Sequence, residues 1–135
     1  MIYRKEIELR YSDTDQMGVI YHANYFSFFE QGRTEMLKEL GINYYDIEKR
    51  GYIFPVRDVG CTYLQSIRLG EKVFCETEII ELTKVRMDFS HRIFNENGVL
   101  KAKGYSSIIS VNKADFSIVK MDKHLPDVYK IKEKI

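Results

Sequence analysis

The chain has 135 residues, the size of one domain, and we predict a single domain over residues 1–135. Basic and acidic side chains nearly balance, with a net charge of +1, so the molecule offers no bulk attraction to nucleic acid or to an anionic membrane. No segment resembles a signal peptide, and none approaches the ~18 consecutive apolar residues of a membrane-spanning helix. We therefore expect a cytoplasmic protein without membrane insertion.

The first third of the chain predicts a strand, a polar loop and a long buried helix. Alternating polarity over residues 3–11 is typical of a half-buried strand. After the loop, apolar residues recur at helical spacing from Tyr25 to Leu40, and Gly41 supplies a residue that commonly ends a helix. The density of aromatic residues at the start of this helix predicts that it is covered on more than one side.

The rest of the chain predicts mostly strands. Asn43 is expected to cap a short helix that runs to about Lys49. Beyond it the apolar period changes to two. The expected strands cover residues 59–63, 73–79, 85–93 and 99–111, with a short one at 116–120. Asn97-Gly98 indicates a hairpin, and Pro126 is expected to begin a last short helix.

One long helix and about five strands with short connections predict an α+β domain with a mostly antiparallel sheet. A helix this apolar suggests that the sheet wraps around it. Since one sheet cannot easily cover both itself and such a helix, we expect the chain to pair with a second copy.

The loop before the long helix carries the candidate chemistry. Asp13 and Asp15 are compatible with simple turn and capping roles. However, Gly18 permits a close approach of backbone or ligand, and an apolar segment follows it. A carboxylate near a helix N-terminus and apolar walls can attack a carbonyl carbon or deprotonate a water that does so. Backbone N–H groups around His22 and Ala23 would then stabilise the oxyanion.

Other nucleophiles and metal sites have little support. The sequence has no G-x-S-x-G motif and no histidine pair at metal-ligand spacing. Cys61 and Cys75 lie in strand-like apolar runs and are expected to be free thiols. His91 shares a face with apolar residues, which favours a core or interface role. The His22 ring either orients or lines a site, or makes a structural hydrogen bond.

Each of three further side chains near the loop is compatible with two roles. Tyr21 and Tyr25 either line an acyl pocket or pack in the core. Glu30 stands among aromatic residues of the helix and is expected to pair with Arg33 one turn later, the alternative being a second acid or base.

The run Y-S-D-T-D-Q-M-G-V-I-Y-H-A-N-Y-F-S-F-F-E, residues 11–30, closely resembles the active-site signature of hot-dog-fold acyl-CoA thioesterases of the 4-hydroxybenzoyl-CoA thioesterase family, in particular the YbgC-type branch. A weaker resemblance covers the whole chain, including the run F-P-V-R-D-V-G-C-T-Y-L that begins at Phe54. The resemblance implies a long central helix wrapped by an antiparallel sheet. It also implies homodimers or homotetramers with sites at the subunit interface.

By motif position, Asp15 resembles the catalytic carboxylate and Asp13 a supporting residue. Gly18 and the backbone N–H near His22 fall where the family polarises the thioester carbonyl. Family members differ in using the aspartate as nucleophile or general base, so both roles stay open here. His22 and Ala23 match the YbgC-type pattern, which favours an aliphatic acyl group.

The resemblance further implies an acyl-CoA substrate, with no metal and no bound cofactor. Coenzyme A carries phosphates, so basic residues are expected at the mouth of the site, and Arg57 and Arg86 are candidates. Two alternatives stay open, namely a thioesterase that takes its acyl group from an acyl carrier protein and a module that binds acyl thioesters without turnover. No H-x-x-x-x-P-G dehydratase motif is present near the helix.

Overall fold

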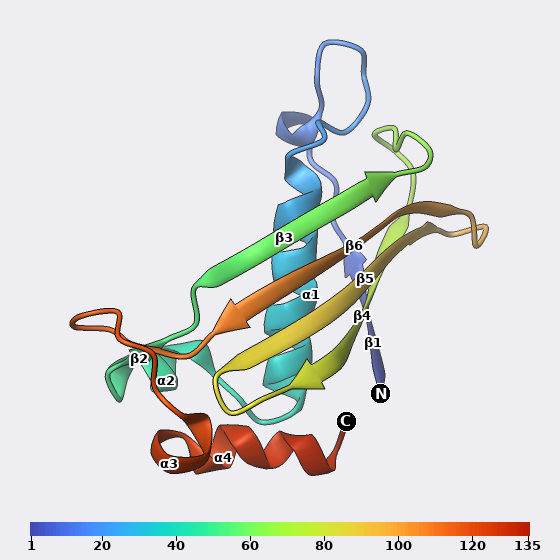
Figure 1. Ribbon diagram of the computed structural model, residues 1–135. Helices are drawn as coiled ribbons and strands as arrows, with labels where there is room; N and C mark the ends of the chain where they lie inside the picture. The colour runs from blue at the N-terminus through green and yellow to red at the C-terminus, as the bar shows by residue number, and fades with distance from the viewer.

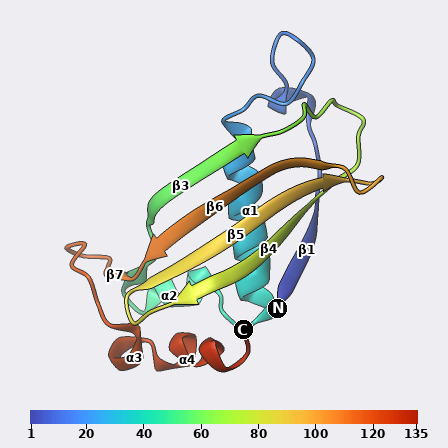
Figure 2. The same cartoon turned by 45° about the vertical axis from the view of Figure 1, so that its right-hand side comes forward.

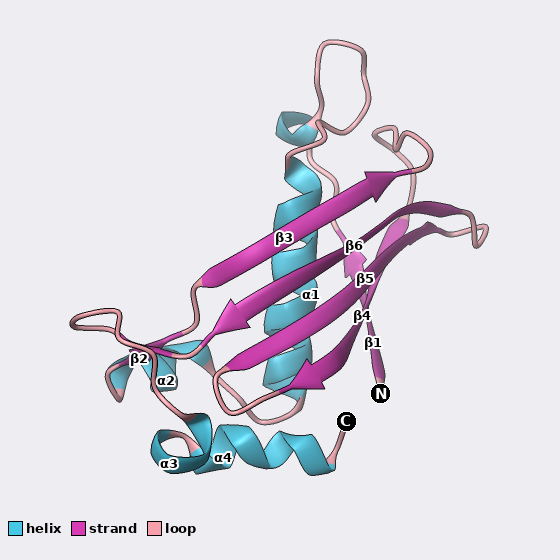
Figure 3. Ribbon diagram, in the orientation of Figure 1, coloured by secondary structure: helices cyan, strands magenta, loops and turns pink.

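The computed structural model describes residues 1–135 and has one long helix packed against a five-stranded antiparallel sheet (Figures 1 and 3). The strands follow the order β1-β4-β5-β6-β3, so β1 and β3 form the two edges. The predicted α+β architecture is confirmed. No helix has the length and apolar content needed to cross a membrane.

Along the chain, one strand is followed by two helices, then by six strands and finally by two short helices. The strands are β1 (Ile2–Ile7), β2 (Tyr52–Ile53), β3 (Val56–Tyr63), β4 (Val73–Leu82), β5 (Arg86–Asn95), β6 (Leu100–Ile109) and β7 (Val111–Asn112). The helices are α1 (Asn24–Glu39), α2 (Tyr44–Lys49), α3 (Met121–His124) and α4 (Pro126–Tyr129), with 3-10 turns at Tyr11–Asp13 and Lys130–Glu133.

Helix α1 places its apolar side on the sheet, whose strands run diagonally across it (Figure 2). Phe29 and Met36 are fully buried there, and Gly32 lets the helix backbone approach Thr77 of β4 closely. The opposite side of the helix is open to solvent and polar. Phe26 is the apolar exception on this side and is 36% exposed. The helix is therefore covered on one side within the chain, not on several sides as the aromatic density predicted.

Strand β1 ends earlier than alternating polarity predicted. The ladder with β4 stops at the pair Ile7 and Val73, and a 3-10 turn begins at Tyr11. The cause is Asp13, whose carboxylate accepts the backbone N–H of Arg10 at 2.9 Å and so turns the chain away from the sheet. Tyr11, expected on the buried face of the strand, is 82% exposed.

The second half of the chain follows the predicted order with one exception. Asn43 caps α2 by accepting the backbone N–H of Tyr45 at 2.8 Å, and the Asn97-Gly98 turn joins β5 to β6 as predicted. The prediction of a strand at residues 116–120 was wrong, since only a single bridge between Val111 and Ile118 forms there. Strand β7 instead pairs with β2 in a small second sheet.

Candidate active site

The loop between β1 and α1 is held in place by the buried Asp13. Its carboxylate accepts the Arg10 backbone N–H at 2.9 Å and the Arg10 guanidinium at 3.4 Å. Its carbonyl oxygen accepts the Tyr21 backbone N–H at 2.8 Å and the Asn24 side-chain amide at 2.9 Å. These bonds tie the loop to the first turn of α1, so Asp13 supports the loop and does not itself face open space.

Asp15 follows on a tight turn that leaves half of its carboxylate unused. Its Oδ1 atom accepts the backbone N–H groups of Met17 at 2.8 Å and Val19 at 3.4 Å, whereas Oδ2 has no hydrogen-bond partner in the chain. Gly18 has a φ of +79°, in the left-handed region that favours glycine, and its N–H donates to the Asp15 carbonyl at 3.2 Å. One oxygen therefore fixes the orientation of the carboxylate, and the other remains available.

The start of α1 offers two unpaired backbone donors. The N–H groups of His22 and Ala23 make no hydrogen bond within the chain, while those of Tyr21 and Asn24 do. Free N–H groups ahead of a 16-residue helix lie at the positive end of its dipole. They can therefore donate hydrogen bonds to a nearby oxygen on which negative charge develops, and so stabilise that charge.

A cavity of about 300 Å³ joins the loop, the helix and the end of β3. Apolar and polar side chains both line it. The lining residues are Asp15, Met17, Val19, Ile20, His22, Tyr25, Tyr63, Leu64, Gln65 and Ser66. The carboxylate with the available oxygen therefore belongs to a residue that lines this cavity.

Tyr25 and Tyr63 form one wall of this cavity. Their rings pack edge to face with centroids 4.8 Å apart, and the Tyr63 hydroxyl donates to the His22 carbonyl at 2.7 Å. Burial raises the pKa of both phenols to about 12, so neither ionises near neutral pH. Burial also raises the pKa of the neighbouring Cys61 thiol, which keeps it protonated and a poor nucleophile.

Of the nine predicted site residues, Asp15, His22 and Tyr25 line this cavity. Asp13, Gly18 and Ala23 belong to the loop and helix start beside it without lining it. The other three lie elsewhere. Tyr21 is 46% exposed and packs against the His22 ring in a tilted arrangement, with centroids 4.4 Å apart, without lining the cavity. Arg57 is exposed near the start of β3, and Arg86 begins β5, both toward the end of the sheet away from Tyr63. Arg86 is held by ion pairs with Asp88 and Glu81, each at 3.0 Å.

The sequence did not point to Tyr63, which the fold brings to the loop from β3. The sequence holds only a weak signal for it. Tyr63 stands two residues after Cys61, so the alternation of the strand places both on the side that faces the helix. The predicted pairing of Glu30 with Arg33 was wrong, because no ion pair of the chain includes either residue. His91 is fully buried in the core, as its apolar neighbours predicted.

A long helix across one antiparallel sheet, with an aspartate loop at the helix start, defines a hot-dog-fold enzyme. The sequence profile of the thioesterase superfamily matches residues 17–102, and the chain belongs to this family. It is 39% identical over 133 residues to the putative acyl-CoA thioesterase YneP of Bacillus subtilis, covering 98% of this chain and 96% of that protein.

Two further relatives agree with this membership. The chain is 30% identical over 111 residues to the acyl-CoA thioester hydrolase YbgC of Escherichia coli, covering 82% of this chain and 83% of that protein. The crystal structure of a DHNA-CoA thioesterase from Staphylococcus aureus superimposes with a TM-score of 0.95 at 38% identity, covering 98% of this chain and 89% of that one. The resemblance to YbgC-type thioesterases is thereby confirmed.

Proposed function

We propose that the protein hydrolyses the thioester bond of an acyl-CoA, giving a free acid and coenzyme A. The observation that carries this proposal is the cavity shared by Asp15, with its available Oδ2, and by His22, whose backbone N–H is unpaired. YneP and YbgC, which are named for acyl-CoA thioesters, support the choice of substrate class.

In the general-base route, Asp15 takes a proton from a water molecule as the water oxygen adds to the thioester carbonyl carbon. The carbonyl π electrons move to oxygen, and the backbone N–H groups of His22 and Ala23 donate to the oxyanion. One such donor contributes about 3 kcal/mol to transition-state stabilisation in other acyl-transfer enzymes. Collapse of the intermediate breaks the C–S bond, and the leaving thiolate takes up the proton held by Asp15.

In the nucleophilic route, an Asp15 oxygen itself adds to the carbonyl carbon and expels the thiolate, which leaves a mixed anhydride. Water then hydrolyses the anhydride, releasing the acid and restoring the carboxylate. The same backbone donors serve both routes. A single turnover in ¹⁸O-water identifies the nucleophilic route when water attacks the Asp15 carbonyl of the anhydride, because that attack places ¹⁸O in the protein, whereas the general-base route places it only in the released acid.

We propose that the acyl group enters beside Tyr25 and that Tyr21, whose ring packs against His22, stands at the entrance. The aliphatic preference expected from the loop motif remains part of this proposal. DHNA-CoA is the comparison substrate, because the relative from Staphylococcus aureus is described as a DHNA-CoA thioesterase. We also propose self-association through the open edge of β3, which would bring Arg57 of a second copy toward the cavity as a phosphate ligand of coenzyme A.

The experiment is release of free thiol from short and long aliphatic acyl-CoAs, DHNA-CoA and an acyl carrier protein thioester. We predict that Asp15→Asn lowers kcat by on the order of 100-fold or more, because the amide can neither accept the proton nor attack the carbonyl. Asp46→Asn on the exposed side of α2 serves as the matched control and should keep wild-type turnover. Full turnover by Asp15→Asn would remove the catalytic assignment, and binding without turnover by the wild type would favour a binding module.

A further inference from the structure

Arg33, in the middle of α1, is a buried cation without a counter-charge. It is 5% exposed, and no carboxylate lies within ion-pair distance of it. A guanidinium keeps its charge at any physiological pH, and a buried charge without a partner is costly. A negatively charged oxygen bound beside Arg33 would therefore lower the cost of burying its charge.

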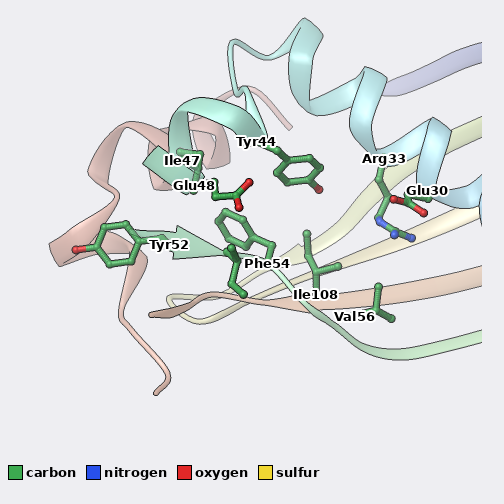
Figure 4. Close-up of a pocket in the computed structure, with 10 residues that line it drawn as sticks. Glu30, Arg33, Tyr44, Ile47, Glu48, Tyr52, Phe54, Val56 and Ile108 are labelled. Atoms are coloured by element: carbon green, nitrogen blue, oxygen red, sulfur yellow. The ribbon is translucent and has the colours of Figure 1, made fainter. Parts of the chain in front are cut away.

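Arg33 borders a cavity of about 260 Å³ between α1, α2 and the start of β3 (Figure 4). Most of its walls are apolar, and they include Ile47, Phe54, Val56 and Ile108. This cavity shares no lining residue with the cavity at Asp15. Arg33 lies nine residues beyond the first residue of α1, or ~14 Å along the helix axis from its start.

Tyr44 adds a second donor to the same end of the cavity. In Figure 4 its hydroxyl points from α2 toward the Arg33 guanidinium. Burial raises the pKa of Tyr44 to about 12, although the charge of Arg33 acts in the opposite direction. The hydroxyl therefore stays protonated and able to donate a hydrogen bond.

Two carboxylates also line the cavity and affect what it accepts. Glu48 is paired with Lys113 at 2.9 Å, which offsets its charge. Glu30 is exposed and has no ion-pair partner, but its charge acts on the Tyr44 hydroxyl, as that of Arg33 does in the opposite direction, so it opposes an incoming anion although solvent screens it. The buried Arg33, less screened than Glu30, dominates the potential at the inner end of the cavity.

We propose that this cavity binds an apolar group that ends in a carboxylate, with Arg33 and Tyr44 donating hydrogen bonds to the carboxylate oxygens. A guanidinium suits a carboxylate because its N–H groups match the two oxygens. The apolar walls suit a short alkyl chain. Two sources carry this chemistry, a free carboxylic acid and an acyl chain with a carboxylate at its far end. The second source rests on the proposed function and on the proposed pairing of β3 edges, which would bring the Asp15 cavity of a second copy toward this cavity.

The first test measures binding without turnover, by calorimetric titration with hexanoate and with hexan-1-ol, which has the same chain length and no charge. We expect hexanoate to bind at least tenfold more tightly than the alcohol. Arg33→Met should weaken hexanoate binding at least tenfold, while Glu30→Gln should tighten it. Arg92→Met, on an exposed arginine of β5, is the matched control and should leave binding unchanged.

The Arg33→Met variant should fold, because it replaces an unpaired buried charge with an apolar side chain of similar length. Its melting temperature without ligand should equal or exceed that of the wild type. Equal affinity for hexanoate and hexan-1-ol, no binding of hexanoate to the wild type, or unchanged binding in Arg33→Met would each overturn the proposal. None of these readouts depends on hydrolysis, so their failure is distinct from failure of the proposed function.

The second test distinguishes the two sources by comparing turnover of adipoyl-CoA and hexanoyl-CoA, which differ by the terminal carboxylate. If the acyl chain is the occupant, Arg33→Met should raise KM for adipoyl-CoA alone by about tenfold. If a free acid is the occupant, both KM values should stay unchanged while hexanoate binding is lost. Either result keeps the carboxylate site, and an equal rise in both KM values with unchanged hexanoate binding would remove it.

Discussion

At the scale of single residues, His91 is a base kept uncharged by the core. Its ring nitrogens lie 3.0 Å from the Thr77 hydroxyl and 2.8 Å from the Ser106 hydroxyl, and its ring stacks on Phe29 with centroids 4.5 Å apart. Burial, assisted by the charge of Arg33, lowers its pKa to about 3. Every hydrogen-bonding atom of the ring is therefore satisfied by the neutral form.

This arrangement predicts a loss of stability in acid. Between pH 6.5, the ordinary pKa, and about 3, His91 binds a proton in the unfolded chain but not in the folded one, so the free energy of unfolding falls as the pH falls. The loss across this window is on the order of 5 kcal/mol. Replacing the titrating ring by His91→Gln should flatten the pH dependence of urea unfolding over this range.

The carboxylates titrate in both proteins and provide the common background for that comparison. A slope that is identical in wild type and His91→Gln would contradict the assignment. His124→Gln, at an exposed histidine in α3, is the control that should leave the slope unchanged, since the exposed ring has no comparable burial.

The sequence predicted these residues unevenly. The places of Asp15 and His91 in the fold could be predicted because each stands in a local pattern, a polar loop before a helix and an apolar strand face, whereas the catalytic role of Asp15 stays a prediction. The pairing of Glu30 with Arg33 failed because i,i+3 spacing brings two Cβ atoms near each other but does not decide where a guanidinium turns. Tyr63 was missed because contact between a strand end and a distant loop depends on the folded sheet.

At the scale of elements, the close packing of α1 on the sheet depends on Gly32. A Cβ added at this position would clash with the Thr77 hydroxyl and lie 3.3 Å from the Cys75 sulfur. Both neighbours are fully buried and have no room to withdraw. The helix therefore approaches β4 at a distance that only glycine permits.

We predict that Gly32→Ala destabilises the fold even though alanine is the better helix former. Overpacking costs about 1–3 kcal/mol, and the gain in helix propensity offsets at most about 1 kcal/mol. Chemical denaturation should show the loss as a lower midpoint at unchanged slope. Ser27→Ala on the exposed side of the same helix should stay within about 0.5 kcal/mol of wild type. A stabilised Gly32→Ala protein would show that α1 can move away from the sheet.

The elements themselves were largely predictable, since their periods are local properties of the sequence. The helix after the loop, the cap at Asn43 and the hairpin at Asn97-Gly98 all form. The end of β1 was not predictable from alternation. It is set by the hydrogen bond from Arg10 to Asp13, and a side chain that competes with the ladder gives no signal in a period of two.

At the scale of the whole molecule, the unpaired edge of β3 explains how the aromatic start of α1 could gain more cover. Strand β3 pairs only with β6, and apolar side chains are exposed at both of its ends, with Val56 at 49% and Tyr63 at 42%. Tyr63 borders the Asp15 cavity and Val56 borders the Arg33 cavity. Antiparallel pairing with β3 of a second copy would therefore bring the Asp15 cavity of one chain toward the Arg33 cavity of the other.

This geometry predicts that lysines on β3 separate the copies. Asp58→Lys with Thr62→Lys places two positive charges on exposed positions of the edge, and charged edge strands resist pairing. Sedimentation velocity should find the wild type at twice the chain mass and the double variant shifted toward the monomer. Glu96→Lys with Asn97→Lys, in the β5–β6 turn, makes the same change in charge away from the edge and should stay associated.

Turnover measured on the same samples connects association to the site. If coenzyme A is held by Arg57 of a second copy, the dissociated variant should show a raised KM for acyl-CoA, and turnover should recover as protein concentration restores the dimer. The Asp15 carboxylate and the free N–H groups of His22 and Ala23 belong to one chain, so part of the activity should survive at saturating substrate. A double variant that remains at twice the chain mass would place the interface on another surface.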